Sequence, residues 1–232
     1  MQTKNENQEL QFILSKIRNI FFDVDGTLFS SEHMLEEVYH QSILEFFKNK
    51  HYNKKLPTLE EIIQYVGLPV KEIFQNLLPD LSEEERQEIS NNVLKILVER
   101  IENGEGLHYD GVEEVIKYLH NKNYKLFAAS NGRRPYVEAI LKVNKIYDFF
   151  YEIPCIDNKT IFNKIELVQH TIKKHQLLPE ECAIIGDRAS DRIAAEKNHI
   201  YFIAADYGHG EQSERNGALL HIQSIKDLLK YF

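Results

Sequence analysis

The strongest constraint on this chain is a short apolar run that ends in two acids and a glycine. Residues 19–26 read NIFFDVDG, a pattern typical of a buried strand that leads into a tight turn. Taken alone, an ordinary hairpin turn at Asp25 and Gly26 explains the run about as well. The pattern of the rest of the sequence is needed to distinguish these two interpretations.

After residue 104, short apolar runs alternate with amphipathic segments. The predicted strands span residues 124–129, 151–156, 182–185 and 200–204, of which 151–156 has the weakest pattern. The predicted helices span residues 112–120, 135–143, 162–175, 190–198 and 224–230. Strands that alternate with helices of about 10–15 residues indicate βαβ units and a parallel sheet. We therefore expect an α/β fold.

The pattern is different between the first predicted strand and this alternating part. Residues 31–104 contain long helical stretches, and Ser82 with Glu85 has the form of a capping box. The length of 232 residues exceeds the ~150 residues of an average domain. We expect residues 1–30 and 105–232 to form an α/β core domain, and residues 31–104 to form an all-helical domain inserted into it.

Composition excludes several classes of protein. Hydrophobic residues make up 43% and charged residues 28% of the chain, which is ordinary for a soluble protein with a core. The formal net charge of −8 makes the chain a poor candidate for binding nucleic acid. From the sequence we expect neither a membrane span nor a signal peptide. We expect a cytoplasmic protein in which Cys155 and Cys182 are buried structural thiols.

Four carboxylates are predicted to gather at one edge of the sheet. Asp23 and Asp25 follow the first strand, Asp187 follows the strand at 182–185, and Asp191 lies near the start of the next helix. Ligands of an open parallel sheet bind beyond the carboxyl ends of its strands. Carboxylates that share a crevice repel each other unless a hard cation lies among them, and oxygen ligands without cysteine suit Mg²⁺. We therefore expect a magnesium site.

A phosphate site is predicted beside the metal. Ser130 and Asn131 follow the strand at 124–129, and a hydroxyl with backbone amides at a strand end suits a phosphate, as does a lysine. Each piece also has a purely structural explanation, such as a strand end or a helix cap. Together they occur in a consistent order at one sheet edge, which indicates metal-assisted phosphoryl chemistry.

These motifs resemble those of the haloacid dehalogenase-like hydrolases. Residues 23–28, DVDGTL, are similar to the first signature of that family, Ser130 with Asn131 to its second, and residues 186–191, GDRASD, to its fourth. The resemblance runs from about residue 17 to the C-terminus. It implies a Rossmann-like parallel sheet core with helices on both faces and an inserted all-helical cap.

The resemblance also implies roles for the acids. Asp23 would attack phosphorus and form an aspartyl-phosphate, while Asp25 would protonate the leaving group and then activate water. True dehalogenases lack that second acid. Mg²⁺ would be held by the Asp23 carboxylate, the Asp25 backbone carbonyl and Asp187, with Asp191 bound directly or through water.

The family's phosphate-binding residues are assigned in the same way. Ser130 and the Asn131 amide would hold the phosphoryl oxygens. The third motif supplies a lysine, for which Lys164 is the choice. Ile165 stands where a proline usually follows that lysine, so Lys159 remains a competitor.

Residues 186–188 and 207–210 resemble the phosphoglycolate phosphatase-like branch of the family. Pyrophosphatases and 5′-nucleotidases use the same catalytic residues and remain alternatives. A sugar phosphomutase fits less well, because Leu35 stands where those enzymes carry a histidine. Arg133 and Arg134 follow the serine motif and could contact a substrate anion, although solvation is the simpler interpretation for at least one of them.

We therefore expect a Mg²⁺-dependent phosphatase of a small phosphorylated metabolite, monomeric or homodimeric, with no nucleic-acid or membrane partner. A phospho-acceptor module of the receiver type is an alternative from another class, since it also uses an acidic Mg²⁺ pocket and an aspartyl-phosphate. Asp25 argues against it, because a switch must keep its phosphate. The receiver fold also has no place for a helical insert after its first strand.

Overall fold

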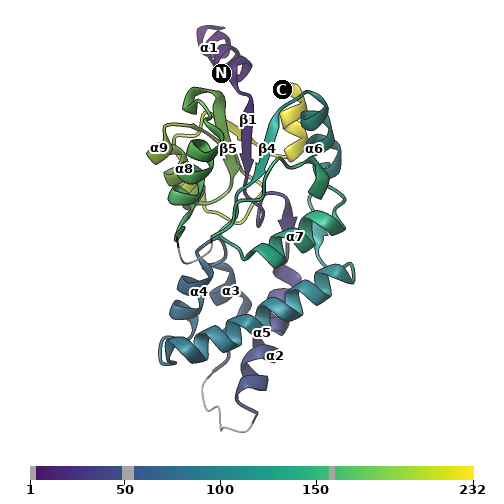
Figure 1. The fold of residues 1–232 in the computed structure, drawn as a ribbon, viewed down its shortest axis with the longest axis vertical. Coiled ribbons are helices and arrows are strands. Elements are labelled where there is room, and N and C mark those ends of the chain that lie inside the picture. Colours follow the sequence, from purple (N-terminus) through teal and green to yellow (C-terminus); the bar gives the residue numbers. More distant parts are fainter. Residues whose placement is uncertain (1–3, 49–54, 157–159) are drawn as a thin grey trace.

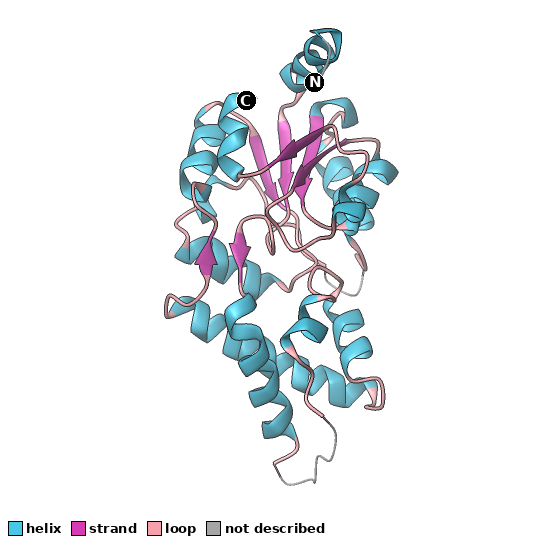
Figure 2. Ribbon diagram, turned by 180° about the vertical axis from the view of Figure 1, so that it is seen from behind, coloured by secondary structure: helices cyan, strands magenta, loops and turns pink. Residues whose placement is uncertain are grey.

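The computed structural model describes residues 4–48, 55–156 and 160–232. At its centre is a five-stranded sheet with the order β4-β1-β5-β6-β7, in which every neighbouring pair is parallel. The strands are β1 (Asn19–Phe22), β4 (Lys125–Ala128), β5 (Cys182–Gly186), β6 (Tyr201–Ala205) and β7 (Leu220–Ile222). Helices lie on both faces of the sheet (Figures 1 and 2). The predicted fold class is confirmed.

β1 is the central strand that carries the apolar run. It lies between β4 and β5 and is parallel to both, so the run is not one arm of a hairpin. Phe21 stacks on Phe127 on one face of the sheet, with ring centroids 4.7 Å apart. Phe22 packs edge-on against Phe150 on the other face, at 6.3 Å. A strand buried on both faces requires an unbroken apolar sequence.

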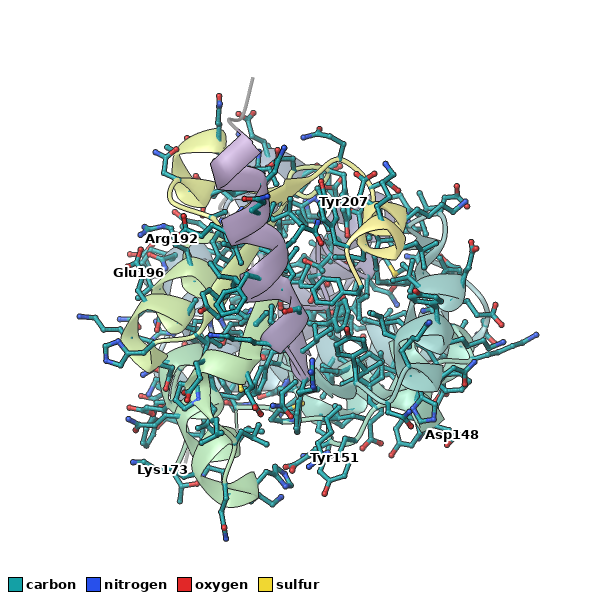
Figure 3. The ribbon with its side chains drawn as sticks, turned by 90° about the horizontal axis from the view of Figure 1, so that it is seen from above. Asp148, Tyr151, Lys173, Arg192, Glu196 and Tyr207 are labelled. Carbon is teal, nitrogen blue, oxygen red and sulfur yellow. The ribbon has the colours of Figure 1, made fainter. Side chains whose placement is uncertain are left out.

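The helices of the core pack on the two faces of this sheet. α8 (Lys164–His175) and α9 (Ala189–Asn198) cover one face, while α6 (Val112–Asn121) and the 3₁₀ helix Ile225–Lys230 cover the other. α7 (Arg134–Val143) lies between the sheet and the insert, and α1 (Lys4–Lys16) extends beyond the sheet at the opposite end (Figure 1). On the outer side of α9, Arg192 Nη1 lies 2.6 Å from Glu196 Oε1 (Figure 3).

The helical insert lies beyond the other end of the sheet (Figure 1). It consists of α2 (Glu32–Phe46), α3 (Leu59–Ile63), α4 (Val70–Leu77) and α5 (Glu83–Glu102). The predicted capping box is present at the start of α5: Ser82 Oγ accepts from the Glu85 N–H at 3.2 Å, and the Ser82 N–H donates to Glu85 Oε2 at 2.9 Å. We call this insert the cap. The domain boundaries at residues 30 and 104 stay a prediction.

Three details of the predicted secondary structure differ from the structure. Residues 151–156 form isolated bridges at Glu152 and Cys155 instead of a strand, because Pro154 has no N–H to donate. The closing helix is a 3₁₀ helix over Ile225–Lys230. Three short strands were not predicted, because they are too short to show a periodic pattern. They are β2 (Phe29–Ser30) and β3 (Leu107–His108), which pair antiparallel, and β7.

Both cysteines are buried and unpaired, as predicted. Burial raises the pKa of the Cys155 thiol to about 11, so the thiol stays protonated and unreactive near neutral pH. Within the described ranges, no helix has the length and apolar character needed to cross a membrane.

Candidate active site

Asp23 lies directly beyond the carboxyl end of β1, at the centre of the sheet. Its N–H donates to the carbonyl oxygen of Ile185 in β5 at 2.9 Å, which continues the ladder by one residue. Its side chain is buried, and Oδ1 accepts a hydrogen bond from Lys164 Nζ at 2.7 Å. The predicted nucleophile is therefore held by both its backbone and its side chain.

Lys164 is the first residue of α8 and is buried in the same place. Its Nζ contacts Asp191 Oδ1 at 2.6 Å in addition to Asp23. Burial alone would lower the lysine pKa, but the charges of Asp191 and Asp23 outweigh that effect and raise the pKa. The structure therefore brings Lys164 to the predicted site as a fixed positive charge. The competing Lys159 lies outside the described residues.

Asp187 follows β5 and is fully buried. Its Oδ2 accepts hydrogen bonds from the backbone N–H groups of His209 and Gly210, at 2.7 Å and 3.0 Å. Gly26 approaches the same oxygen with a φ of +79°, and a Cβ at that position would lie 2.5 Å from Asp187 Oδ2. Residue 26 is therefore required to be glycine. Residues 207–210 hold a predicted metal ligand, a role that sequence reasoning missed.

Three buried acids form a group that could hold a metal ion. One oxygen from each of Asp23, Asp187 and Asp191 lies within 4.8 Å of the others. Asp23 Oδ2 and Asp187 Oδ1 are buried and have no hydrogen-bond partner among the described residues. Both oxygens of Asp191 have donors, namely Lys164 Nζ and the N–H of Arg188. This oxygen-only set fits the predicted Mg²⁺, with Asp23 and Asp187 as the better placed ligands.

The same acids are electrostatically unfavourable as they stand. The cluster contains three carboxylates, and its ammonium group is that of Lys164, which contacts Asp23 and Asp191. Burial, followed by the charge of Asp23, raises the pKa of Asp187, and the same two causes raise the pKa of Asp191 to about 7. Close like charges at a buried site favour the neutral form unless a cation compensates them. A divalent cation would supply that compensation.

Asp25 is half-buried and is not part of the three-acid group. The Tyr136 hydroxyl, from α7, donates to Asp25 Oδ1 at 2.5 Å and lies 3.1 Å from the Ser31 hydroxyl. Burial, together with the charges of Asp23 and Asp187, raises the pKa of Asp25 to about 7, although the Tyr136 hydrogen bond lowers it. A carboxyl group with that pKa can serve as an acid and as a base near neutral pH.

Tyr136 is a second residue that sequence reasoning missed. It lies on the buried face of an amphipathic helix, where a tyrosine is typical of the hydrophobic core and does not indicate a functional role. Its pairing with Asp25 joins residues 111 positions apart. Its position a few residues after the serine motif was the available signal, and that signal does not distinguish it from its neighbours in α7.

Tyr136→Phe is expected to move the alkaline limb of the pH–rate profile to higher pH. The hydroxyl stabilises the ionised form of Asp25, so its loss raises the Asp25 pKa above about 7. An acid with a higher pKa stays protonated, and so active, to higher pH. Profiles of kcat/KM against pH for wild type and variant test this, with the α6 variant Tyr118→Phe as control. A limb that stays in place contradicts the role of Asp25 as the acid.

Ser130 and Asn131 lie beyond the end of β4, beside the acids. Ser130 is buried and its Oγ accepts from the Gly132 N–H at 2.9 Å, which leaves the hydroxyl hydrogen to be donated elsewhere. Asn131 Nδ2 donates to the carbonyl oxygen of Gly67, in the cap, at 2.6 Å. The asparagine side chain therefore joins core and cap. Its backbone amide remains the group predicted to contact a phosphoryl oxygen.

A cavity of about 80 Å³ connects these residues to the cap, and Asp23, Asp25, Ser130, Asn131 and Arg133 all line it. The Arg133 guanidinium contacts the Ser90 carbonyl oxygen and lies 2.6 Å from Asn91 Oδ1, both in α5. Arg134 is exposed and lies 3.6 Å from Glu138 Oε1. Of the two predicted arginines, Arg133 is at the cavity, where it holds the cap, and Arg134 is a solvated surface residue.

Solved structures with this fold include several hydrolases. A predicted phosphatase from Clostridium acetobutylicum superposes with a TM-score of 0.76 and 24% identity, covering 92% of this chain and 97% of that one. A predicted phosphoglycolate phosphatase from Haemophilus somnus superposes with a TM-score of 0.79 and 18% identity, covering 93% and 97%. At these identities the comparison establishes a shared fold.

Sequence comparison extends this result. The pyrophosphatase PpaX of Listeria innocua is 28% identical over 184 residues, which cover 79% of this chain and 80% of the relative. The pyrophosphatase PpaX of Anoxybacillus flavithermus is 24% identical over 183 residues, covering 78% and 79%. The model of the haloacid dehalogenase-like hydrolases matches residues 20–205, from β1 to the end of β6. The chain belongs to the haloacid dehalogenase-like hydrolase family.

Proposed function

We propose that this hydrolase is a Mg²⁺-dependent phosphatase that cleaves small phosphate monoesters through an aspartyl-phosphate. The observation that carries the proposal is the free, buried oxygen on each of Asp23 and Asp187, within a three-acid group that Lys164 only partly neutralises. Asp25, with a pKa raised to about 7, lies beside that group at the same cavity. The residues proposed as nucleophile, metal ligands and acid thus lie side by side.

In the first half of the reaction, the Asp23 carboxylate attacks phosphorus and the bond from phosphorus to the ester oxygen breaks. Asp25 gives its proton to the departing alkoxide, so a neutral alcohol leaves. In the second half, Asp25 takes a proton from water, the resulting hydroxide attacks phosphorus, and the bond to Asp23 breaks. Inorganic phosphate is released, and both acids return to their starting states.

The remaining residues hold the phosphoryl group. Lys164, whose pKa is raised by Asp191 and Asp23, stays positively charged beside the nucleophile. The Ser130 hydroxyl and the Asn131 amide would donate to phosphoryl oxygens. Bound through Asp23 and Asp187, Mg²⁺ supplies positive charge that stabilises the transferred group. We also propose that the protein works in the cytoplasm, as a monomer or homodimer and without nucleic acid, in keeping with its formal charge of −8.

Pyrophosphate hydrolysis by the same residues is the second candidate. The likeness to the Listeria and Anoxybacillus proteins named pyrophosphatase PpaX favours it. In that reaction a second phosphate is the leaving group, and Asp25 would protonate it in place of an alkoxide.

The test is phosphate release by the purified protein from phenyl phosphate, phosphoglycolate, sugar phosphates, nucleotides and pyrophosphate. Each substrate is assayed with Mg²⁺ and with EDTA. We expect turnover of at least one monoester that EDTA abolishes and that added Mg²⁺ restores. Turnover that ignores EDTA, or no phosphate release from any substrate with Mg²⁺, overturns the proposal.

A further inference from the structure

The cavity above the catalytic acids has two chemically different walls. The core wall is polar and carries Asp23, Asp25 and Ser130. The cap wall is built from aliphatic and aromatic side chains, among them Leu35 of α2, Phe74 of α4, and Leu94 with Leu97 of α5. The polar side chains of the described cap residues that line the cavity are Ser31, whose hydroxyl lies 3.1 Å from that of Tyr136, and Tyr39, whose ring stacks on Phe74 with centroids 5.4 Å apart.

Among the described residues, two cations lie at the site, and both already make hydrogen bonds. Lys164 is held between Asp23 and Asp191, where it faces the phosphoryl group. Arg133 is the charged lining residue with a positive side chain among those the structure describes, and its guanidinium donates to oxygens of Ser90 and Asn91 in α5, all of them uncharged. A negative charge on the leaving group that lay against the apolar cap wall would lose its hydration without gaining an ion pair from that wall.

From this division we propose that the leaving group of the natural substrate is a small, uncharged and mainly apolar alcohol. The inference rests on the proposed phosphatase function and concerns the same site. At about 80 Å³, the cavity has room for about half a dozen water-sized groups. A phosphoryl group with a short alkyl chain fits that room, and the released alcohol would carry the proton that Asp25 gives to its oxygen.

The first experiment compares two esters that differ in charge and hardly in shape. Beyond the bridging oxygen, isobutyl phosphate and phosphoglycolate have the same number of non-hydrogen atoms, branched in the same way. Isobutyl phosphate ends in two methyl groups, where phosphoglycolate ends in the two oxygens of a carboxylate. We expect kcat/KM for isobutyl phosphate to be at least about tenfold higher, since an unpaired, desolvated carboxylate is strongly disfavoured. Pyrophosphate is measured in parallel and is expected to be poorer still.

The outcomes separate this inference from the proposed function. If phosphoglycolate or pyrophosphate matches or exceeds isobutyl phosphate in the presence of Mg²⁺, the apolar leaving group is wrong and the phosphatase activity stands. If none of these substrates, nor phenyl phosphate with its better leaving group, releases phosphate, the proposed function itself fails.

A second experiment places a cation on the cap wall. Leu94 is half-buried and lines the cavity, so the stem of a lysine in Leu94→Lys can follow the apolar wall while its ammonium group stays hydrated. We expect the ratio of kcat/KM for phosphoglycolate to that for isobutyl phosphate to rise about tenfold, as a charge-assisted contact would produce.

The matched control is Ile96→Lys. Ile96 is also half-buried in α5 but is not among the residues that line the cavity, so this change adds the same charge to the same helix. We expect the substrate ratio of Ile96→Lys to equal that of wild type. Equal ratios in all three proteins, or a rise in the control as large as in Leu94→Lys, would show that the cap wall does not select the leaving group. The wild-type comparison stands if Leu94→Lys does not fold.

Discussion

Asp23→Asn is expected to lower kcat for phosphate release by at least about a thousandfold, because the amide that replaces the carboxylate is not a nucleophile. The change preserves the shape of the side chain, and the amide oxygen can still accept the hydrogen bond from Lys164 Nζ that Asp23 Oδ1 accepts at 2.7 Å. Wild-type protein that is quenched in acid during turnover should carry a phosphoryl group on Asp23, detectable by mass spectrometry. The variant should carry none.

Melting temperatures distinguish a variant that has lost the nucleophile from one that has lost its fold. The charge of Asp23 raises the pKa of both Asp187 and Asp191, so its removal relieves repulsion within the metal-free site. We therefore expect Asp23→Asn to melt in EDTA at the wild-type temperature or above it. The exposed Asp110, paired with Lys226 at 2.8 Å, supplies the control Asp110→Asn, which should keep full activity. Activity of Asp23→Asn within tenfold of wild type would rule out the covalent mechanism.

Asp187→Asn is expected to abolish the stabilisation of the protein by Mg²⁺. In wild type, an ion concentration of a hundred times Kd should add about 2.7 kcal/mol to the free energy of unfolding. Asp187 Oδ1 is a free buried oxygen of the site, and an amide nitrogen in its place cannot bind a cation. The other oxygen, which accepts from the His209 and Gly210 amides, is retained, so the loop at that position keeps its contacts.

The order of stability should therefore reverse between the two conditions. In EDTA the variant is expected to melt at the same temperature as wild type or higher, because burial and the charge of Asp23 penalise the ionised Asp187. With Mg²⁺ the wild type should be the more stable protein. Thermal melts with increasing Mg²⁺ measure both effects. Equal stabilisation of the two proteins by Mg²⁺ would remove Asp187 from the metal site.

The stability of the metal-free protein is expected to depend on pH through the buried carboxyl groups of the site. Burial, followed by the charge of Asp23, raises the pKa of Asp191 from 3.8 to about 7. A carboxyl whose pKa is raised on folding stabilises the folded state below its unfolded pKa and loses that contribution as pH rises through its folded pKa. In EDTA the free energy of unfolding should therefore fall between about pH 4 and pH 7. Mg²⁺ should flatten that decline.

Part of the site could be predicted from the sequence because its residues directly follow the predicted strands. Asp23, Ser130 and Asp187 each come directly after an apolar run, and parallel strands bring their carboxyl ends to one edge. Lys164 lacks the proline that usually follows the lysine of the third motif, and its burial between Asp23 and Asp191 supports its assignment as the phosphate-binding lysine. The prediction of a strand at residues 151–156 was wrong for a local reason, because Pro154 has no backbone N–H to donate to a neighbouring strand.

The sequence by itself determined the α/β fold, the helical insert and the acids that meet at the sheet edge, because strand and helix periodicity and motif spacing are local properties of the chain. Only the tertiary structure decided which oxygens of those acids remain free, that Tyr136 donates to Asp25, and that a mainly apolar cap wall shares the cavity with Asp23 and Asp25. Each of these depends on packing between elements far apart in the chain, which no local pattern records.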